Sequence, residues 1–311
     1  MRTVFLGSSS FAVEILKALV DSPHRPSLVV TPPDRPKGRG RKVAAPPAAE
    51  AARELELTLL QTANVNGESE LAEIAGHEPE AIGVCEFGQL IKEPLLSRYL
   101  ILNVHPSLLP RWRGAAPIER ALMAGDSETG VTIFEIGEGL DSGPTALSRV
   151  EQVLQDDSAG TLSARLARLG GELLVEALDK AAKGELALTE QTEEGATYAH
   201  KIQAEERRLD PARPAAELER IVRALTPHVG AYIALPGGER LGVTEATSSD
   251  PDSNAVAAGE LRAVDGHLFL GSSQGALELI QVQPPGKRPM AAADYLRGHT
   301  PPARVSEEPA S

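Results

Sequence analysis

Residues 99–117 read Y-L-I-L-N-V-H-P-S-L-L-P-R-W-R-G-A-A-P. The apolar run at residues 99–102 predicts a strand, and Asn103 and His105 come where this strand gives way to a loop. Because residues two apart on a strand project from the same face, we expect the Asn103 amide and the His105 imidazole to share one pocket. The stretch therefore predicts a sheet that carries polar chemistry at the end of one strand.

The segments before this stretch alternate strand and helix patterns. Short apolar runs at residues 3–6, 27–31 and 81–85 predict strands, and residues 11–19 carry apolar side chains at helical spacing. A strand, a turn of small residues and a helix form the opening unit of a doubly wound, mostly parallel α/β sheet. The turn at residues 7–10, G-S-S-S, lacks the G-x-G-x-x-G pattern of dinucleotide sites, so we expect no nicotinamide cofactor.

A carboxylate follows the next strand pattern. Residues 131–136 form a β-branched run, and Asp141 stands after it among glycines that let the loop bend back toward His105. The three groups suit the attack of an amine on an activated acyl group: Asn103 would hold the oxyanion, His105 would take a proton, and Asp141 would orient the imidazole. The alternative is turn chemistry, because Asn and Asp beside glycine and proline commonly stabilise turns.

The second half of the chain shows a different pattern of predicted helices and strands. Residues 158–183 predict a long amphipathic helix or a pair of helices, and a polar stretch follows. After a further helix pattern at residues 215–225, short strand patterns alternate with turns at even spacing, which is typical of a small closed barrel. At 311 residues two domains are expected. We place an α/β catalytic domain at residues 1–188, a linker at 189–205 and a small β-barrel domain at 206–311.

The composition of the chain indicates the kind of cellular compartment to expect. The lone Cys85 excludes an internal disulfide and fits a reducing compartment. No apolar run approaches the roughly 20 residues of a membrane helix, and the first two residues lead into a strand pattern rather than a signal peptide. We therefore expect a soluble, cytoplasmic monomer, and we expect no metal because no cluster of metal ligands stands out in the sequence.

A basic segment stands out in an acidic chain. The formal net charge of −13 disfavours a nucleic-acid partner, but binding depends on local patches. Residues 32–42 read P-P-D-R-P-K-G-R-G-R-K, and their prolines and glycines predict an exposed, mobile loop outside helix and sheet. Its basic residues are Arg35, Lys37, Arg39, Arg41 and Lys42. The alternative is that this charge run is only a solvated surface.

Residues 103–117, with A-G-D-S-E-T-G-V-T-I at 124–133 and G-L-D-S-G at 139–143, resemble the signature of folate-dependent formyltransferases. The resemblance covers nearly the whole chain and implies a Rossmann-like formyltransferase domain followed by an OB-like domain. It implies transfer of the formyl group of 10-formyltetrahydrofolate to the amino group of methionine on initiator tRNA, with Asn103, His105 and Asp141 as catalytic residues. The basic segment resembles the insertion that holds the tRNA acceptor arm, and the C-terminal domain is expected to bind tRNA as well.

The resemblance also implies a folate site made by two segments. The expected folate-binding residues are Phe87, Gly88, Gln89, Leu90, Ser107, Leu108, Leu109 and Pro110. Glu86 and Phe87 depart from the alanine and tyrosine that are usual in the family, so recognition there is expected from the backbone. The stiff, apolar S-L-L-P segment suits one face of a flat heterocycle.

Two alternatives stay open at this point. A folate-dependent formyltransferase or formyl-folate hydrolase with a small-molecule acceptor would share the three catalytic residues but not the basic segment. A non-catalytic module that binds tRNA or folate would need neither the imidazole nor the carboxylate.

Overall fold

The structure is a computed structural model that describes residues 1–37, 42–249 and 256–306. The chain divides into two compact units. The first comprises Met1–Pro117, Glu128–Gln152 and Ser163–Ala199, and the second comprises Ile118–Ser127, Val153–Leu162 and His200–Ser311. The division is therefore discontinuous in sequence, and the residues that we expected to form a linker are shared between the two units.

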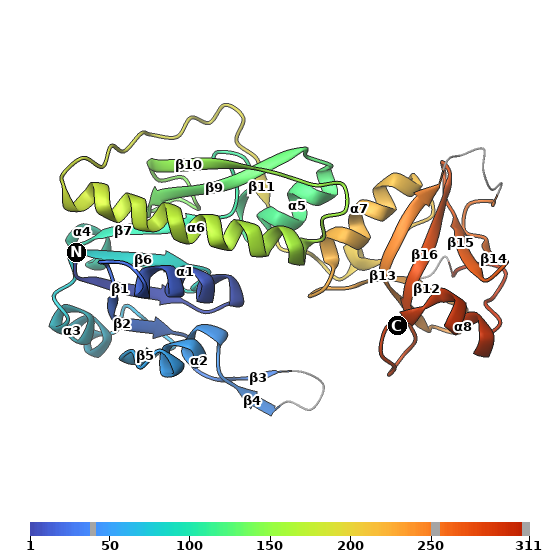
Figure 1. Ribbon diagram of the computed structural model, residues 1–311, viewed down its shortest axis with the longest axis horizontal. Helices are drawn as coiled ribbons and strands as arrows, with labels where there is room; N and C mark the ends of the chain where they lie inside the picture. Colours follow the sequence, from blue (N-terminus) through green and yellow to red (C-terminus); the bar gives the residue numbers. More distant parts are fainter. Residues whose placement is uncertain (38–41, 250–255, 307–311) are drawn as a thin grey trace. The chain divides into compact units, whose positions relative to one another are not determined.

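Seven strands form the main sheet of the first unit, in the order β10-β9-β7-β6-β1-β2-β5 (Figure 1). Five neighbouring strands, from β7 to β5, are parallel, whereas β9 runs antiparallel to β7 and β10 runs antiparallel to β9. This confirms the predicted mostly parallel α/β sheet. The strands are β1 (Thr3–Gly7), β2 (Pro26–Thr31), β5 (Leu59–Gln61), β6 (Ala81–Cys85), β7 (Leu100–His105), β9 (Glu128–Glu135) and β10 (Thr145–Gln152).

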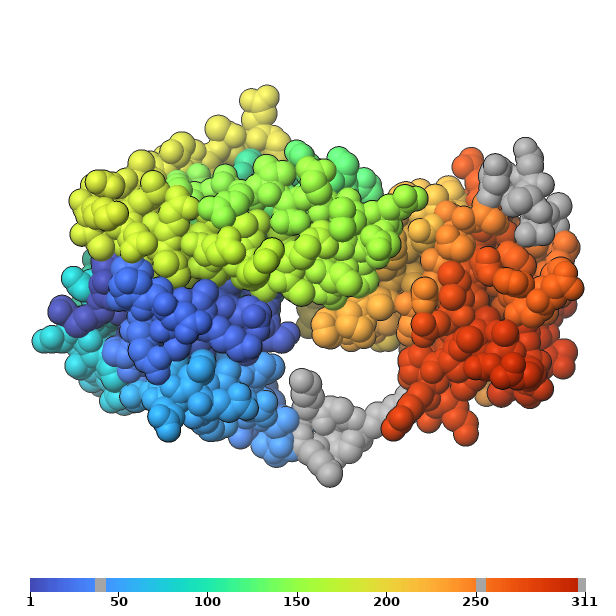
Figure 2. Space-filling view, viewed as in Figure 1, coloured from blue at the N-terminus to red at the C-terminus, as the bar shows by residue number. Residues whose placement is uncertain are grey.

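Helices cover both faces of this sheet. α1 (Ser10–Val20) and α6 (Ala159–Ala182) lie over one face, and their side chains abut in the space-filling view (Figures 1 and 2). They approach so closely that a Cβ on Gly171 would lie 2.7 Å from Cβ of Ala18. Ile74 and Leu95 pack into the core on the other face. They come from α3 (Glu68–Gly76) and α4 (Leu95–Arg98), and α2 (Pro47–Glu54) also belongs to this unit, whereas nearly all of α5 (Pro117–Ala124) belongs to the second unit.

The strand order defines where a ligand is expected. From β1 the chain moves outward to β2 and β5, and it then returns to β6 and β7 on the other side of β1. In doubly wound sheets, ligands bind beside the carboxyl ends of the strands at this reversal. Here those ends are Gly7 of β1 and Cys85 of β6, which are paired neighbours. The segment after β6 and the end of β7 therefore lie at the expected ligand site.

The basic segment differs from its prediction. Arg35–Lys37 (β3) and Lys42–Ala44 (β4) pair as an antiparallel ribbon, so the expectation of a backbone outside any sheet was wrong. Pro36 is compatible with this ribbon because a two-stranded sheet has outer edges on which no N–H is needed. Arg39 and Arg41 lie outside the described residues. A second two-stranded pairing, β8 (Arg113–Gly114) with β11 (Tyr198–Ala199), was also not predicted.

The second unit contains a six-stranded sheet in the order β12-β13-β16-β15-β14, with β17 paired to β16, and all of these pairs are antiparallel. Its core is formed by the apolar faces of the strands with α7 and Tyr295 of α8. Its elements are a 3₁₀ turn (Glu205–Arg207), α7 (Ala215–Leu225), β12 (Ala231–Ala234), β13 (Arg240–Ser249), β14 (Leu261–Val264), β15 (His267–Gly271), β16 (Ala276–Gln283), β17 (Met290–Ala291) and α8 (Ala292–Gly298).

The last described residues join the two edges of this sheet. Ser306 donates its backbone N–H to Ala234 at the end of β12 at 2.8 Å, and Leu261 of β14 donates to Ala303 at 2.9 Å. The sheet is thus closed as the barrel pattern predicted. Ser306 is thus ordered by a partner far away in the sequence, and residues 307–311 lie outside the described part. Among the described residues, no helix has both the length and the apolar character to span a membrane.

Candidate active site

Strand β7 positions the first two candidate residues. Val104 lies toward α6, where a Cβ on Gly170 would come within 2.7 Å of it, so Asn103 and His105 project from the opposite face. Asn103 is half-buried, and within residues 1–37, 42–249 and 256–306 its side-chain amide has no hydrogen-bond partner. The amide is therefore available to an incoming group.

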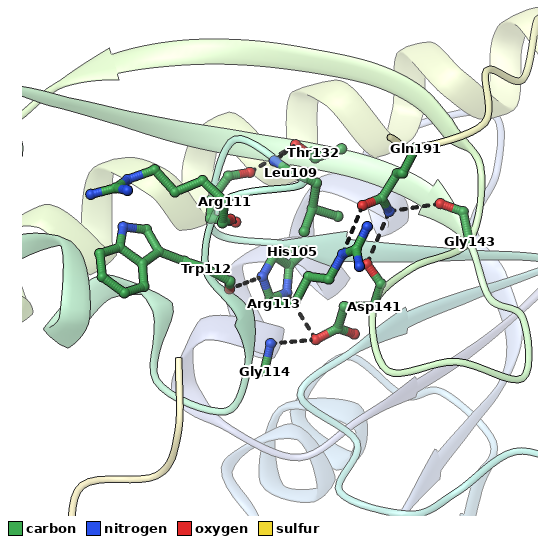
Figure 3. A network of polar contacts seen from close by, with 11 residues as sticks. His105, Leu109, Arg111, Trp112, Arg113, Gly114, Thr132, Asp141, Gly143 and Gln191 are labelled. Carbon is green, nitrogen blue, oxygen red and sulfur yellow. Dashed lines mark hydrogen bonds and ion pairs between the residues drawn. The ribbon is translucent and has the colours of Figure 1, made fainter. Parts of the chain in front are cut away.

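His105 is buried and polarised by a backbone carbonyl. Its Nε2 lies 2.9 Å from the Trp112 carbonyl oxygen, which can only accept, so Nε2 carries the proton (Figure 3). Burial lowers the pKa of His105, and the Asp141 charge and the Trp112 hydrogen bond oppose this shift only in part. This shift favours the neutral ring, in which the unprotonated Nδ1 can accept a proton.

Asp141 faces that nitrogen. Its Oδ2 lies 3.8 Å from Nδ1 of His105, which is within ion-pair distance but too long for a hydrogen bond. The same oxygen accepts the backbone N–H of Gly114 at 2.8 Å (Figure 3). The carboxylate is therefore fixed by the backbone of β8, and it would stabilise a proton that arrives on Nδ1.

A rigid turn follows β7. The Ser107 hydroxyl donates to the Arg111 carbonyl at 2.6 Å, and Thr132 donates to the Ser107 carbonyl at 2.7 Å. Thr132 also accepts the backbone N–H of Leu109 at 3.1 Å (Figure 3). Ser107 is fully buried, so its side chain stabilises the turn rather than facing the expected folate site. Leu108, Leu109 and Pro110, at the tip of the turn, are half-buried.

In residues 87–90, the second segment expected to bind folate, it is mainly the backbone that is free to contact a ligand. The side chain of Phe87 is buried in the core, and that of Gln89 donates to the Thr62 carbonyl at 2.7 Å. Gly88 has a φ of 76°, and a Cβ there would meet nothing within 4 Å. Leu90 is 67% exposed. Gly88 and Leu90 can thus face a ligand, whereas Phe87 and Gln89 hold the segment in place.

Two further residues complete the site, and one of them carries no local signal in the sequence. Gln191 lies in the polar stretch that we expected to be a linker, yet its Nε2 donates to the backbone carbonyls of Asp141 at 2.9 Å and of Gly143 at 2.7 Å. Arg113, which belongs to the stretch at residues 99–117, is buried and donates from Nε to Oε1 of Gln191 at 3.1 Å (Figure 3). Gln191 thus contacts the loop that carries Asp141 directly, and Arg113 contacts that loop through Gln191.

The candidate tRNA-binding residues and the metal expectation can be placed in part. Arg35 is exposed on β3, and the backbones of Lys37 and Lys42 form the last pair of the ribbon. Arg39 and Arg41, in the connection between the strands, lie outside the described residues. In the described part of the chain, no three His, Cys, Asp or Glu side chains are grouped to hold a metal ion. The absence of a metal stays a prediction.

Comparison with known proteins gives consistent matches over most of the chain. The sequence profile described as formyl transferase matches residues 1–178, and the profile of the formyl transferase C-terminal domain matches residues 201–300. A methionyl-tRNA formyltransferase from Methylococcus capsulatus is 43% identical over 96% of this chain and 97% of its own, and one from Halorhodospira halophila is 42% identical over 96% of both. The solved structure of HypX from Aquifex aeolicus in complex with tetrahydrofolic acid matches the fold with a TM-score of 0.67 at 20% identity, over 95% of this chain and 47% of that one.

Proposed function

The chain belongs to the formyl transferase family, as do the methionyl-tRNA formyltransferases that match it over nearly its whole length, and from this premise we propose that it formylates methionyl-tRNA. The formyl donor is 10-formyltetrahydrofolate, the acceptor is the amino group of methionine on initiator tRNA, and the product serves translation initiation in the cytoplasm. One observation carries the proposal: the Asn103 amide, which has no hydrogen-bond partner in the described part of the chain, and the buried His105 share one face at the end of β7, with Asp141 3.8 Å from the imidazole.

The reaction begins with the neutral amine. Its lone pair attacks the formyl carbon, and the carbonyl oxygen becomes an oxyanion. The Asn103 amide is the donor that stabilises this charge, because a fixed donor aimed at a developing oxyanion is usually the largest catalytic term. Its lack of a partner among the described residues supports this role.

The tetrahedral intermediate then loses the proton of its ammonium nitrogen. Nδ1 of His105 can accept it because Nε2 already carries the other ring proton. The resulting imidazolium is stabilised by the Asp141 carboxylate, which faces the same nitrogen. Collapse of the oxyanion breaks the bond to N10 of the folate, and the proton passes to that leaving nitrogen. No covalent bond to the protein is required.

The folate is proposed to lie against the ends of β6 and β7. Leu108, Leu109 and Pro110 supply an apolar wall, and the open backbone around Gly88 supplies hydrogen bonds to the polar edge of the pterin. The sequence expectation also included Phe87, Gln89 and Ser107, whose side chains we now assign to holding these segments. Exposed Leu90 is the further side chain that we propose as a folate contact.

Formyl transfer to charged tRNA tests this proposal directly. The wild-type chain is incubated with 10-formyltetrahydrofolate and methionine-charged initiator tRNA, and formylmethionine is measured after deacylation. We expect rapid formylation of this substrate and none of uncharged tRNA or free methionine. Turnover with a small amine, or donor hydrolysis without an acceptor, would instead favour a small-molecule formyltransferase or a hydrolase.

The role of the basic segment at residues 32–42 is tested by a charge-matched pair of variants. Replacing Arg39 and Arg41 with serine should weaken tRNA binding and flatten its salt dependence by about one unit of log–log slope for each phosphate that is no longer neutralised. The control replaces exposed Arg168 of α6 and Lys183, which directly follows that helix, and so removes the same charge elsewhere. Folate binding should be unchanged in both variants. Equal salt slopes for the two variants would show that Arg39 and Arg41 make no specific phosphate contact.

A further inference from the structure

The loop that carries Asp141 has an unfavourable backbone conformation. Asp141 has a φ of 47°, in the left-handed region, which Asp adopts more readily than most residues with a Cβ but still at a cost in energy. Gly143, two residues later, packs so closely on the Glu135 carbonyl that a Cβ there would overlap it. Surrounding groups that hold such a conformation offset this cost. The group that holds this loop is therefore relevant to the position of the carboxylate.

Gln191 holds the loop from outside it. Its Nε2 donates to the Asp141 carbonyl at 2.9 Å and to the Gly143 carbonyl at 2.7 Å (Figure 3). The partners fix the orientation of the amide, because two carbonyls can only accept and Arg113 Nε, which faces Oε1 at 3.1 Å, can only donate. The side chain thus uses both of its N–H donors on the two sides of the strained loop.

Contacts outside the loop also hold Gln191 in position. Thr189 exchanges two backbone hydrogen bonds with Thr145, at 2.8 and 2.9 Å, and so anchors the segment two residues before Gln191. Arg113 is 2% exposed and pairs with Glu193 through Nη1 at 2.9 Å. The Gln191 amide therefore presents a preset pair of donors.

We propose that Gln191 is a positioning residue for formyl transfer, which holds the Asp141 loop so that the carboxylate faces Nδ1 of His105. It acts through Asp141 and touches no reacting atom. This proposal rests on the proposed function, because it concerns the same acid–base pair. It also assigns a task to part of the stretch that links the two halves of the sequence.

The kinetic test compares Gln191→Met with a neighbouring control. Methionine has a similar length but cannot donate to the carbonyls, so the carboxylate should move, and kcat should fall by about 10- to 100-fold because small misplacements are costly. The KM for tRNA and folate should stay at the wild-type value. The control Glu193→Gln changes the other partner of Arg113 and should keep the wild-type kcat. An unchanged kcat in Gln191→Met, or an equal loss in the control, would overturn the proposal.

A second variant separates the two contacts of the amide. Gln191→Glu keeps an oxygen for Arg113 but has no N–H for the Asp141 and Gly143 carbonyls. We expect it to lose kcat as Gln191→Met does, and wild-type kcat in this variant would contradict the proposal. It also provides the test if Gln191→Met does not fold.

A substrate-free measurement distinguishes this inference from the proposed function. The Asp141 charge raises the pKa of His105 against the effect of burial, so a displaced carboxylate should lower that pKa further. The pKa is measured by NMR titration of the imidazole in wild type, Gln191→Met and Glu193→Gln, with the signal assigned by its loss in His105→Gln. A lower pKa in Gln191→Met alone supports the inference, and identical titrations refute it. If the wild-type chain failed to formylate methionyl-tRNA, the proposed function would fall, while this titration would still decide whether Gln191 positions Asp141.

Discussion

Replacing Asn103 with alanine separates catalysis from folding unusually well. The Asn103 amide has no hydrogen-bond partner among residues 1–37, 42–249 and 256–306. Its removal therefore deprives none of these residues of a hydrogen bond. The side chain is half-buried at the end of β7, and the free energy of unfolding should change by no more than about 1 kcal/mol. In contrast, the loss of an oxyanion donor typically raises the activation free energy by about 2.7–4 kcal/mol.

The expected result is therefore a large kinetic effect on a stable protein. For Asn103→Ala we expect kcat to fall by roughly 100- to 1000-fold. The KM values should change little, because the amide acts on charge that develops only in the transition state. Single-turnover formylation of methionyl-tRNA, with the chain in excess, measures the chemical step without product release. Thermal melting of the same preparation measures stability.

A matched substitution makes the comparison strict. Asn64→Ala removes the same carboxamide from an exposed turn, where its Oδ1 accepts the Asn66 backbone N–H at 3.2 Å. This control should keep the wild-type single-turnover rate. If Asn103→Ala melted like the wild-type chain and also kept its full single-turnover rate, the assignment of the oxyanion donor would be refuted.

Three further outcomes are expected from the structure. Asp141→Asn removes the charge that raises the pKa of His105, so the acid limb of the kcat/KM profile should move to lower pH, and a limb that stays in place would exclude the pairing. Burial raises the pKa of the Cys85 thiol well above its usual range, so it should resist alkylation at pH 8 in the native chain and react after unfolding; rapid native labelling would contradict this. Leu174→Ala empties a fully buried position on α6 and should lower the free energy of unfolding by about 2–5 kcal/mol in denaturant titrations, whereas a loss below about 1 kcal/mol would mean that the site collapses.

The features that the sequence predicted well are those with local patterns. The apolar run before Asn103 predicts β7, and the two-residue spacing predicts that Asn103 and His105 share a face, which is the arrangement in the structure. The opening strand, turn and helix predict β1 and α1 because each is specified by its own periodicity. The catalytic roles of these residues stay predictions until the kinetics are measured.

The features that the sequence did not predict depend on distant partners. The β3–β4 ribbon includes Pro36 although proline and glycine argued against any strand, because pairing between the two strands outweighs local preference. Ser306 is fixed by hydrogen bonds to residues far away in the sequence, such as Ala234. Gln191 shows no motif, and its role becomes visible only once Arg113 and Asp141 are brought beside it.

The position of Asp141 shows why strand order alone is insufficient. A rule that places functional residues at strand ends works for His105, but β9 runs antiparallel to β7, and its last residue, Glu135, pairs with Leu102. Asp141 therefore follows a strand that has already passed His105 by three residues, or roughly 10 Å at about 3.3 Å per residue, and the loop must return over that distance. Glycines permit this return, but they do not specify where it ends. At that end point the carboxylate accepts the Gly114 N–H and the backbone accepts from the Gln191 amide, so the contacts of Asp141 come from residues 27 and 50 positions away from it.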